Sequence, residues 1–279
     1  MNKKEKKKKM KKILNIMMVV VCISAATVFV AGQERPKESS ARKAFLQRLR
    51  ADSAKQTASA DGLLSVTDVG EPDSFGKNVK FLGTARTGII RIRPNCVAVT
   101  LGPDDRRIEV NPADLSGSAT GDFLNLGRIT IPGRSVGNVV YFIPNNEVAV
   151  SSLNTSAIPS YGYAGYFPYI TIESDALNDP AAIDPGTGLP ANGSLTLGIL
   201  GTRSTTRLFQ PAEQNIDQIE YSTAATRGFA RSYFADLGLP QNVIDRLYRL
   251  PMTIKLNLFV ETNYVRTGFF RYSVRFMGN

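Results

Sequence analysis

The sequence predicts a mainly β protein: an antiparallel β-sandwich of Ig-like or jelly-roll type, with a small two-helix insertion before the last two strands. From Leu63 onward, short runs rich in Val, Ile, Phe and Thr are separated by clusters of Gly, Pro, Asn and Asp. Several runs alternate between apolar and polar residues, as residues 90–93 (Ile-Arg-Ile-Arg) do. This period of two is typical of antiparallel sheets with one buried face.

The expected strands are short and follow one another at nearly regular spacing. In chain order they are Leu63–Thr67, Asn78–Leu82, Gly88–Arg93, Cys96–Leu101, Arg107–Val110, Leu124–Ile131, Val139–Ile143, Val148–Leu153, Tyr166–Ile172, Ser194–Leu200, Thr206–Phe209, Thr253–Glu261 and Thr267–Phe276. The last strand runs almost to Asn279. It therefore lies either between two strands of its own domain or at a sheet edge, where it could pair with another chain and form a homo-oligomer.

Two helices are expected between residues 222 and 250. Ser222–Leu237 has apolar residues at helical spacing, with Ser222 placed to cap it and Gly238 placed to stop it. Gln241–Arg249 supplies the second helix. The pair is expected to cover an open end or edge of the sandwich, with a partner-binding lid as the alternative.

The first 32 residues have the pattern of a bacterial export signal or signal anchor. Eight lysines against one glutamate give residues 1–12 a charge of +7, and an apolar segment, Ile13–Ala31, follows. Small residues before Gln33 favour cleavage there, whereas a retained segment would anchor the chain through residues 13–31. Residues 33–62 form a polar spacer with a short helix over Ser39–Lys55, and residues 63–279 form the β domain. The domain is expected to be extracytoplasmic: in the periplasm, on the cell surface or secreted.

Charge and composition exclude several classes of protein. Of the net charge of +10, only +3 falls after Lys12, where twenty-six basic residues oppose twenty-three acids, so nucleic-acid binding is not expected. The chain has no histidine, which excludes Ser-His-Asp triads, Cys-His dyads and HExxH zinc sites. Cys22 lies in the leader, and Cys96 is expected to be a small buried residue of a strand, with an intermolecular disulfide as the alternative.

A cluster of aromatic residues is the leading candidate for a contact surface. Five aromatics fall in nine residues on what reads as a Gly-rich loop entering a strand: Tyr161, Tyr163, Tyr166, Phe167 and Tyr169. Aromatic rings can stack on sugars or anchor a protein partner, and they can equally pack a loop on itself.

Two kinds of acidic site are weaker candidates. The loop 173–193 offers oxygen ligands suited to calcium, in particular Asp175, Asn178, Asp179 and Asp184, although Asx turns explain these residues equally well. A carboxylate pair for glycoside cleavage could include Glu71, Asp73, Asp104 or Asp105.

These patterns predict an exported, non-enzymatic β-sandwich protein of the bacterial cell envelope or exterior, which binds or assembles with a protein or glycan. The alternatives are a carboxylate-dependent carbohydrate-active enzyme and a calcium-stabilised surface module. No cofactor is expected beyond calcium.

Overall fold

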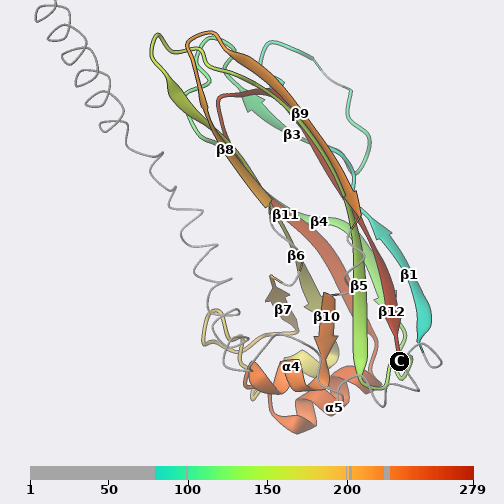
Figure 1. Cartoon of the computed structure of the whole chain (residues 1–279). Helices are drawn as coiled ribbons and strands as arrows, with labels where there is room; N and C mark the ends of the chain where they lie inside the picture. Colours follow the sequence, from blue (N-terminus) through green and yellow to red (C-terminus); the bar gives the residue numbers. More distant parts are fainter. Residues whose placement is uncertain (1–78, 99, 199, 201–202, 223–226) are drawn as a thin grey trace, which may run out of the picture. The chain divides into compact units, whose positions relative to one another are not determined.

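A computed structural model of the chain describes residues 79–98, 100–198, 200, 203–222 and 227–279 (Figure 1). The chain divides into two units, Met1–Glu38 and Ser39–Asn279, and all described residues belong to the second. Several expected features lie outside the described residues: the leader, the spacer, the strand Leu63–Thr67 and the candidate acids Glu71 and Asp73.

The described residues are mainly β, in agreement with the sequence prediction. The strands are β1 (Lys80–Arg86), β2 (Ile90–Pro94), β3 (Arg106–Val110), β4 (Ala119–Ile131), β5 (Val139–Leu153), β6 (Ser160–Glu173), β7 (Ser194–Leu197), β8 (Arg203–Phe209), β9 (Gln214–Ser222), β10 (Arg227–Ala230), β11 (Met252–Asn263) and β12 (Val265–Gly278). The helices are the 3-10 helix η2 (Asp175–Asn178) and the α-helices α4 (Arg231–Asp236) and α5 (Gln241–Arg249).

Within the described part of the chain, the strands form two sheets. The first sheet has seven strands in the order β10-β5-β12-β2-β3, with β1 also pairing with β12 and β9 with β5. The second has five strands in the order β4-β11-β6-β7, with β8 also pairing with β6. The neighbours are antiparallel except β2 and β3, which are parallel.

The two sheets bury their apolar faces against each other, as the alternating sequence requires. On β12, Phe270, Tyr272, Val274 and Phe276 are buried, whereas the alternate residues Arg271, Ser273 and Arg275 are more exposed. Tyr166 of the second sheet stacks on Phe270 of the first, with ring centroids 5.7 Å apart. Burying a side chain of this size stabilises the fold by roughly 1.5–3 kcal/mol, so these inward rows hold the layers together.

The last strand is central, not at an edge. β12 pairs with β5 along its length on one side and with β1 and then β2 on the other. The hypothesis that the C-terminal strand offers a free edge to another chain is therefore wrong, because both of its backbone edges are already used. The two long strands that were expected to close the chain are confirmed.

The helical insertion before those strands is confirmed, but its first helix begins later than expected. Residues 227–230 form β10, which pairs with β5, and α4 begins only at Arg231. Ser222 belongs to β9 and does not cap the helix, since pairing with β5 competes successfully with the helical pattern. Gly238 does end α4, with a left-handed φ of +88°.

Helix α5 packs its apolar face into the core. Val243, Ile244 and Leu247 are fully buried, and α4 and α5 lie together at one end of the two sheets (Figure 1). This position supports the expectation that the insertion covers an open end of the sandwich. No helix of the described residues is long and apolar enough to cross a membrane.

The expected strand Cys96–Leu101 is wrong. Residues 95–105 connect β2 to β3, and because these strands run parallel the chain must turn back between them. The turn begins at once, since the Val97 N–H donates to the Pro94 carbonyl oxygen at 3.1 Å. Cys96 is consequently exposed and not the buried residue that the strand implied.

Candidate functional site

The five clustered aromatic residues lie in a strand, not in a loop. They belong to β6, which pairs with β11 on one side and with β8 and β7 on the other. Tyr166 is buried in the core between the sheets, while Phe167 and Tyr169 pack with Phe259 of β11 in a separate cluster. Tyr161 and Tyr163 are half-buried. Alternation along the strand places Tyr166 on the inner face of the second sheet and the other four rings on the opposite face, where Tyr163 packs against the cluster of Phe167, Tyr169 and Phe259.

The Tyr169 side chain also has a local partner. Its hydroxyl donates to Asp122 Oδ1 of β4 at 2.6 Å, and the Phe167 and Phe259 rings pack 5.9 Å apart. These contacts give Phe167 and Tyr169 a structural role in the second sheet.

The acids and amide proposed for calcium do not converge on one point. Asp179 accepts from the Ala181 N–H and forms an ion pair with Arg246 of α5, and Asp184 accepts from the Gly186 N–H. Asp175 lies in the first turn of η2, which ends at Asn178. Among the residues that the structure describes, no group of three or more His, Cys, Asp and Glu side chains could hold a metal ion.

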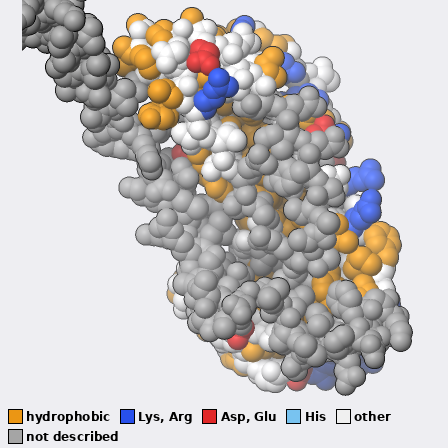
Figure 2. All heavy atoms as spheres, in the orientation of Figure 1, with side chains coloured by type: hydrophobic (Ala, Val, Ile, Leu, Met, Phe, Trp, Pro, Cys, Tyr) orange, Lys and Arg blue, Asp and Glu red, His pale blue; other side chains and the backbone are white. Residues whose placement is uncertain are grey.

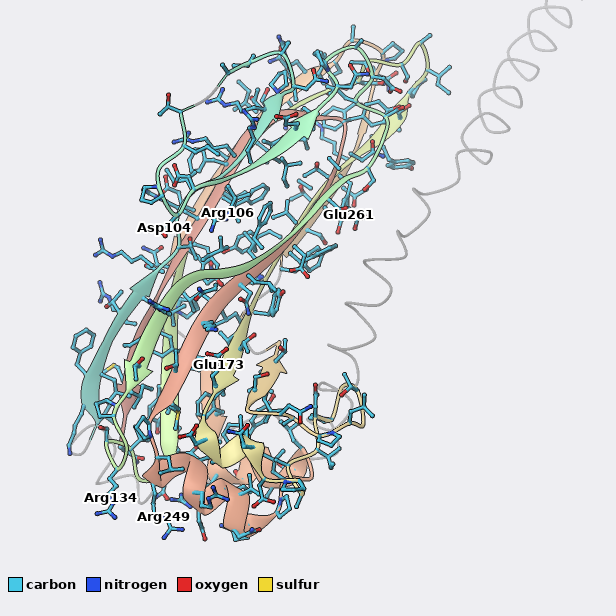
Figure 3. The ribbon with its side chains drawn as sticks, turned by 180° about the vertical axis from the view of Figure 1, so that it is seen from behind. Asp104, Arg106, Arg134, Glu173, Arg249 and Glu261 are labelled. Atoms are coloured by element: carbon cyan, nitrogen blue, oxygen red, sulfur yellow. The ribbon has the colours of Figure 1, made fainter. Side chains whose placement is uncertain are left out.

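Of the candidate catalytic acids, the structure describes Asp104 and Asp105, which follow each other in the turn before β3. Asp105 accepts from the backbone N–H of Ile89 at 2.8 Å and from that of Gly102 at 3.3 Å, so it organises the turn before β3. The other acids labelled in Figure 3, Glu173 and Glu261, come from different elements and lie well apart from Asp104. A glycosidase needs two carboxyl groups that face each other across a cleft, and the described candidates, Asp104 and Asp105, are instead neighbours in one turn.

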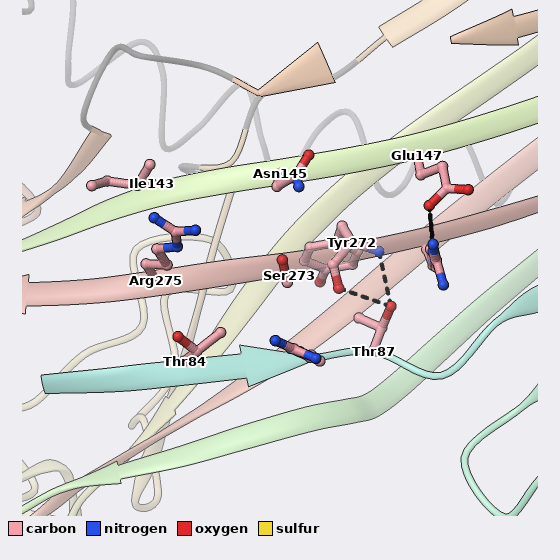
Figure 4. A pocket seen from close by; sticks show the side chains of 10 residues that line it. Thr84, Thr87, Ile143, Asn145, Glu147, Tyr272, Ser273 and Arg275 are labelled. Atoms are coloured by element: carbon pink, nitrogen blue, oxygen red, sulfur yellow. Dashed lines mark hydrogen bonds and ion pairs between the residues drawn. The ribbon is translucent and has the colours of Figure 1, made fainter. Parts of the chain in front are cut away.

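The structure instead forms a recess on the outer face of the first sheet, with a volume of about 390 Å³ (Figure 4). Three strands line it. β1 and the residue after it contribute Thr84, Arg86 and Thr87; β12 contributes Arg271, Tyr272, Ser273 and Arg275; β5 contributes Ile143, Asn145 and Glu147.

The recess lies where the neighbour of β12 changes from β1 to β2. At this point Thr87, the residue after β1, takes over the hydrogen bonding to β12. Its N–H and its hydroxyl both donate to the Tyr272 carbonyl oxygen, at 2.9 and 3.1 Å. The Tyr272 N–H donates back to Thr87 Oγ1 at 3.0 Å. The backbone of Gly88 then passes close to that of Asp104, and only glycine fits there, since a Cβ would lie 2.0 Å from the Asp104 carbonyl oxygen.

Strand register brings three arginines together around Ser273. Ser273 faces Arg86 on β1 and Asn145 on β5, and the next outward residues along β12 are Arg271 and Arg275. Arg86 is therefore the diagonal neighbour of both of these arginines, at a Cα spacing of roughly 7–8 Å. Arg86, Arg271 and Arg275 are all exposed.

The charges of the recess are only partly balanced. Arg271 Nε donates to Glu147 Oε2 at 2.5 Å, and the register places these two residues directly opposite each other. Among the described residues, no acid forms an ion pair with Arg86 or Arg275. Three arginines against one glutamate leave a formal charge of +2.

The rest of the lining offers hydrogen bonds and little apolar surface. The hydroxyls of Thr84 and Ser273 and the amide of Asn145 come from outward positions of adjacent strands. Tyr272 borders the recess, but its side chain points into the core and is 3% exposed. Arginine matches the planar, two-oxygen geometry of carboxylate, phosphate and sulfate groups. The arrangement can therefore hold an oxyanion whose carrier has hydroxyl groups.

The sequence patterns did not predict this recess. The alternation of Arg271, Ser273 and Arg275 with buried apolar residues was the available signal, and it indicates three polar side chains on one face of a strand. Arg86, however, is 187 residues from Ser273 and reaches it only through strand pairing. The strand β9 was also missed.

Comparisons with known proteins add no assignment. No protein-family model matches the sequence, and no curated protein matches it. A solved structure of infectious bursal disease virus, Gx strain, is similar at 9% identity over 71% of this chain, with a TM-score of 0.11. The aligned part covers 64% of the viral chain, and a likeness this weak carries no argument about fold or function.

Proposed function

We propose that this chain is an exported, non-enzymatic binding protein of the bacterial cell envelope or exterior, and that it binds an acidic glycan. The contact surface is the recess on the outer face of the first sheet. The proposal depends on one observation above all: Arg86 and Arg275 lie around Ser273 without an acidic partner among the described residues.

The distribution of charge supports a ligand that carries oxyanions. Repulsion between neighbouring arginines costs free energy in the unliganded protein, and an anion that binds between them removes that cost. Glu147 neutralises Arg271 and holds its guanidinium group beside the recess. An incoming oxyanion then meets Arg86 and Arg275 first, with Ser273 between them.

The uncharged side chains support a saccharide. Asn145, Ser273 and Thr84 present donors and acceptors of the kind that sugar hydroxyls use. Neutral sugars are commonly held by stacking on aromatic faces, and the described lining presents none. Recognition through charge is therefore the mode that these residues favour, in place of the aromatic contact expected from the sequence.

Export is supported by the sequence alone. The lysine-rich start followed by Ile13–Ala31 is typical of a bacterial signal segment, which would deliver the β domain to the outside of the cytoplasmic membrane. Acidic polysaccharides occur in that compartment, so the proposed location and the proposed ligand are consistent.

Calorimetry with the full chain in mild detergent tests the proposal. Digalacturonate supplies carboxylates on a sugar, and a neutral disaccharide is the control ligand. The double variant Arg86→Ala with Arg275→Ala should weaken digalacturonate binding at least tenfold, since one charge-assisted hydrogen bond contributes about 1.5–3 kcal/mol. Arg128→Ala, an exposed arginine of β4 on the second sheet, is the matched control.

The result must separate binding from folding. All variants should keep the unfolding midpoint of the wild type within about 2 °C, because the substituted side chains are exposed. Equal affinity for digalacturonate in wild type and double variant would show that the recess is not the binding site. Equal affinity for the neutral disaccharide would show that charge is not what the protein recognises.

A further inference from the structure

The arginines of the recess are part of a longer basic stripe on the outer face of the first sheet. β2 alternates between fully buried Ile90 and Ile92 and outward Arg91 and Arg93. Arg91 is paired with Phe269 of β12, which continues the outward row of Arg271 and Arg275. The recess and the outward arginines of β2 therefore lie on the same face of the first sheet.

The parallel strand β3 adds to this stripe. Arg107 is paired with Arg91, and Glu109 is paired with Arg93, while Ile108 and Val110 between them are buried. Arg107 also forms an ion pair with Glu109. The β2–β3 part thus has three arginines against one glutamate, which repeats the formal charge of +2 of the recess.

Two features of the β2–β3 part indicate that an anion is needed there. Arg91 and Arg107 are direct neighbours across the ladder, and like charges at such positions destabilise a sheet. The Nε–H groups of Arg91 and Arg93 are also buried and find no hydrogen-bond acceptor within the described residues. Within the described part of the chain, these two Nε–H groups are therefore left without an acceptor, and neither arginine forms an ion pair with an acid.

The two parts together define the size of the ligand. From Arg275 to Phe269, β12 rises by roughly 20 Å at about 3.4 Å per residue, and β2 and β3 extend the stripe beyond. Six arginines face two glutamates along it, which leaves a formal charge of +4. In the space-filling view, a group of basic side chains is visible at the border where β1 lies in Figure 1 (Figure 2).

We propose that the stripe of Arg275, Arg271, Arg86, Arg91, Arg93 and Arg107 binds an acidic polysaccharide as an extended chain, with the recess as the first of two anion subsites. This inference rests on the proposed function and specifies its ligand: a polymer with repeated oxyanions. A single acidic sugar would use only the recess. Saccharide is favoured over nucleic acid because the recess surrounds its arginines with the hydroxyl and amide groups that sugar hydroxyls bind.

The test is the dependence of affinity on ligand length, measured by calorimetry with the full chain. Galacturonate oligomers from dimer to octamer should bind the wild type more tightly as they lengthen, by at least tenfold over the series. Arg91→Ala with Arg93→Ala should abolish this gain, whereas dimer binding should still depend on Arg86 and Arg275. The affinity of the wild type for the octamer should also fall more steeply with salt concentration than that of the variant. The variant has two fewer arginines in the stripe, so its binding of the octamer releases fewer counterions.

Two results would overturn the inference while the proposed function stood. One is an unchanged gain with length in the Arg91→Ala and Arg93→Ala variant, when dimer binding still depends on Arg86 and Arg275. The other is tighter binding of single-stranded DNA of equal charge than of the octamer, which would make the stripe a nucleic-acid surface. If the double variant of Arg86 and Arg275 binds the dimer as the wild type does, the proposed function itself is wrong.

Discussion

Tyr272 of β12 donates a hydrogen bond of 2.6 Å to the carbonyl oxygen of Asn257 on β11, and this bond joins the two sheets through the middle of the apolar core. It is possible because the register of β11 against β4 shifts between Leu256 and Leu258, at Asn257. The Asn257 side chain accepts from the Asn125 N–H at 2.8 Å at the same irregularity. The backbone of Tyr272 meanwhile borders the recess, so one residue connects the core to the proposed site.

Replacing Tyr272 by Phe should destabilise the protein without changing its packing. The variant keeps the ring but leaves the buried Asn257 carbonyl oxygen without its partner, which costs about 1–3 kcal/mol. Chemical denaturation followed by circular dichroism measures the free energy of unfolding. A variant as stable as the wild type would show that this hydrogen bond does not contribute to holding the sheets together.

The same residue predicts how stability depends on alkaline pH. Burial raises the pKa of the Tyr272 phenol well above its ordinary value of 10.0. Because the unfolded chain ionises this group at lower pH than the folded one, its contribution to stability is complete below pH 10 and is lost as the pH rises further. The free energy of unfolding of the wild type should therefore fall more steeply above pH 10 than that of Tyr272→Phe. Parallel curves would contradict this.

Tyr166 should prove structural. Its ring is 2% exposed and its hydroxyl donates to Asn146 Oδ1 of the first sheet at 2.5 Å. Tyr166→Ala should lower the free energy of unfolding by roughly 3–5 kcal/mol, because it opens a cavity between the sheets. Tyr161→Ala, at a half-buried position of the same strand, is the control and should cost about 1 kcal/mol or less. Equal losses of the free energy of unfolding in the two variants would contradict the assignment of Tyr166 to the core.

Asn154 should contribute strongly to stability through its buried amide. It is 1% exposed, and its amide donates to the carbonyl oxygens of Ile158 and Phe209, at 2.9 and 3.1 Å. It thereby ties the turn before β6 to the end of β8. Asn154→Ala should cost about 2–4 kcal/mol, whereas Asn111→Ala, which removes one exposed turn contact, should cost less than about 1 kcal/mol. Urea denaturation of both variants measures the two losses in the free energy of unfolding. Equal losses would contradict the role given to Asn154.

The sequence was sufficient for the features that depend on local pattern. Alternation on β2 and β12 predicted half-buried strands, and the apolar face of residues 241–249 predicted α5. Local pattern predicted the wrong secondary structure where strand pairing between distant residues determines it. Arg227–Ala230 has a helical pattern but lies beside β5, and Cys96 has strand-like neighbours but lies in the turn between two parallel strands.

The candidate site depends even more on pairing between distant residues. The aromatic cluster is conspicuous in sequence because its members are adjacent, yet alternation on β6 separates Tyr166 from Phe167. The arginines of the recess are inconspicuous because Arg86 and Arg275 are far apart in the chain. Only the register of β1 against β12 brings them together, and no short motif encodes that register.

The most direct test of the central claim is to observe the arginine side chains themselves while an acidic oligosaccharide is added. In NMR spectra of the ¹⁵N-arginine-labelled full chain, assigned with single Arg→Lys variants, the Nε–H signals of Arg86, Arg271 and Arg275 should shift in a saturable manner with digalacturonate. The signal of Arg128 on the second sheet should stay in place. Shifts confined to arginines outside the stripe, or no shift at saturating galacturonate octamer, would contradict the proposal that this face binds acidic saccharides.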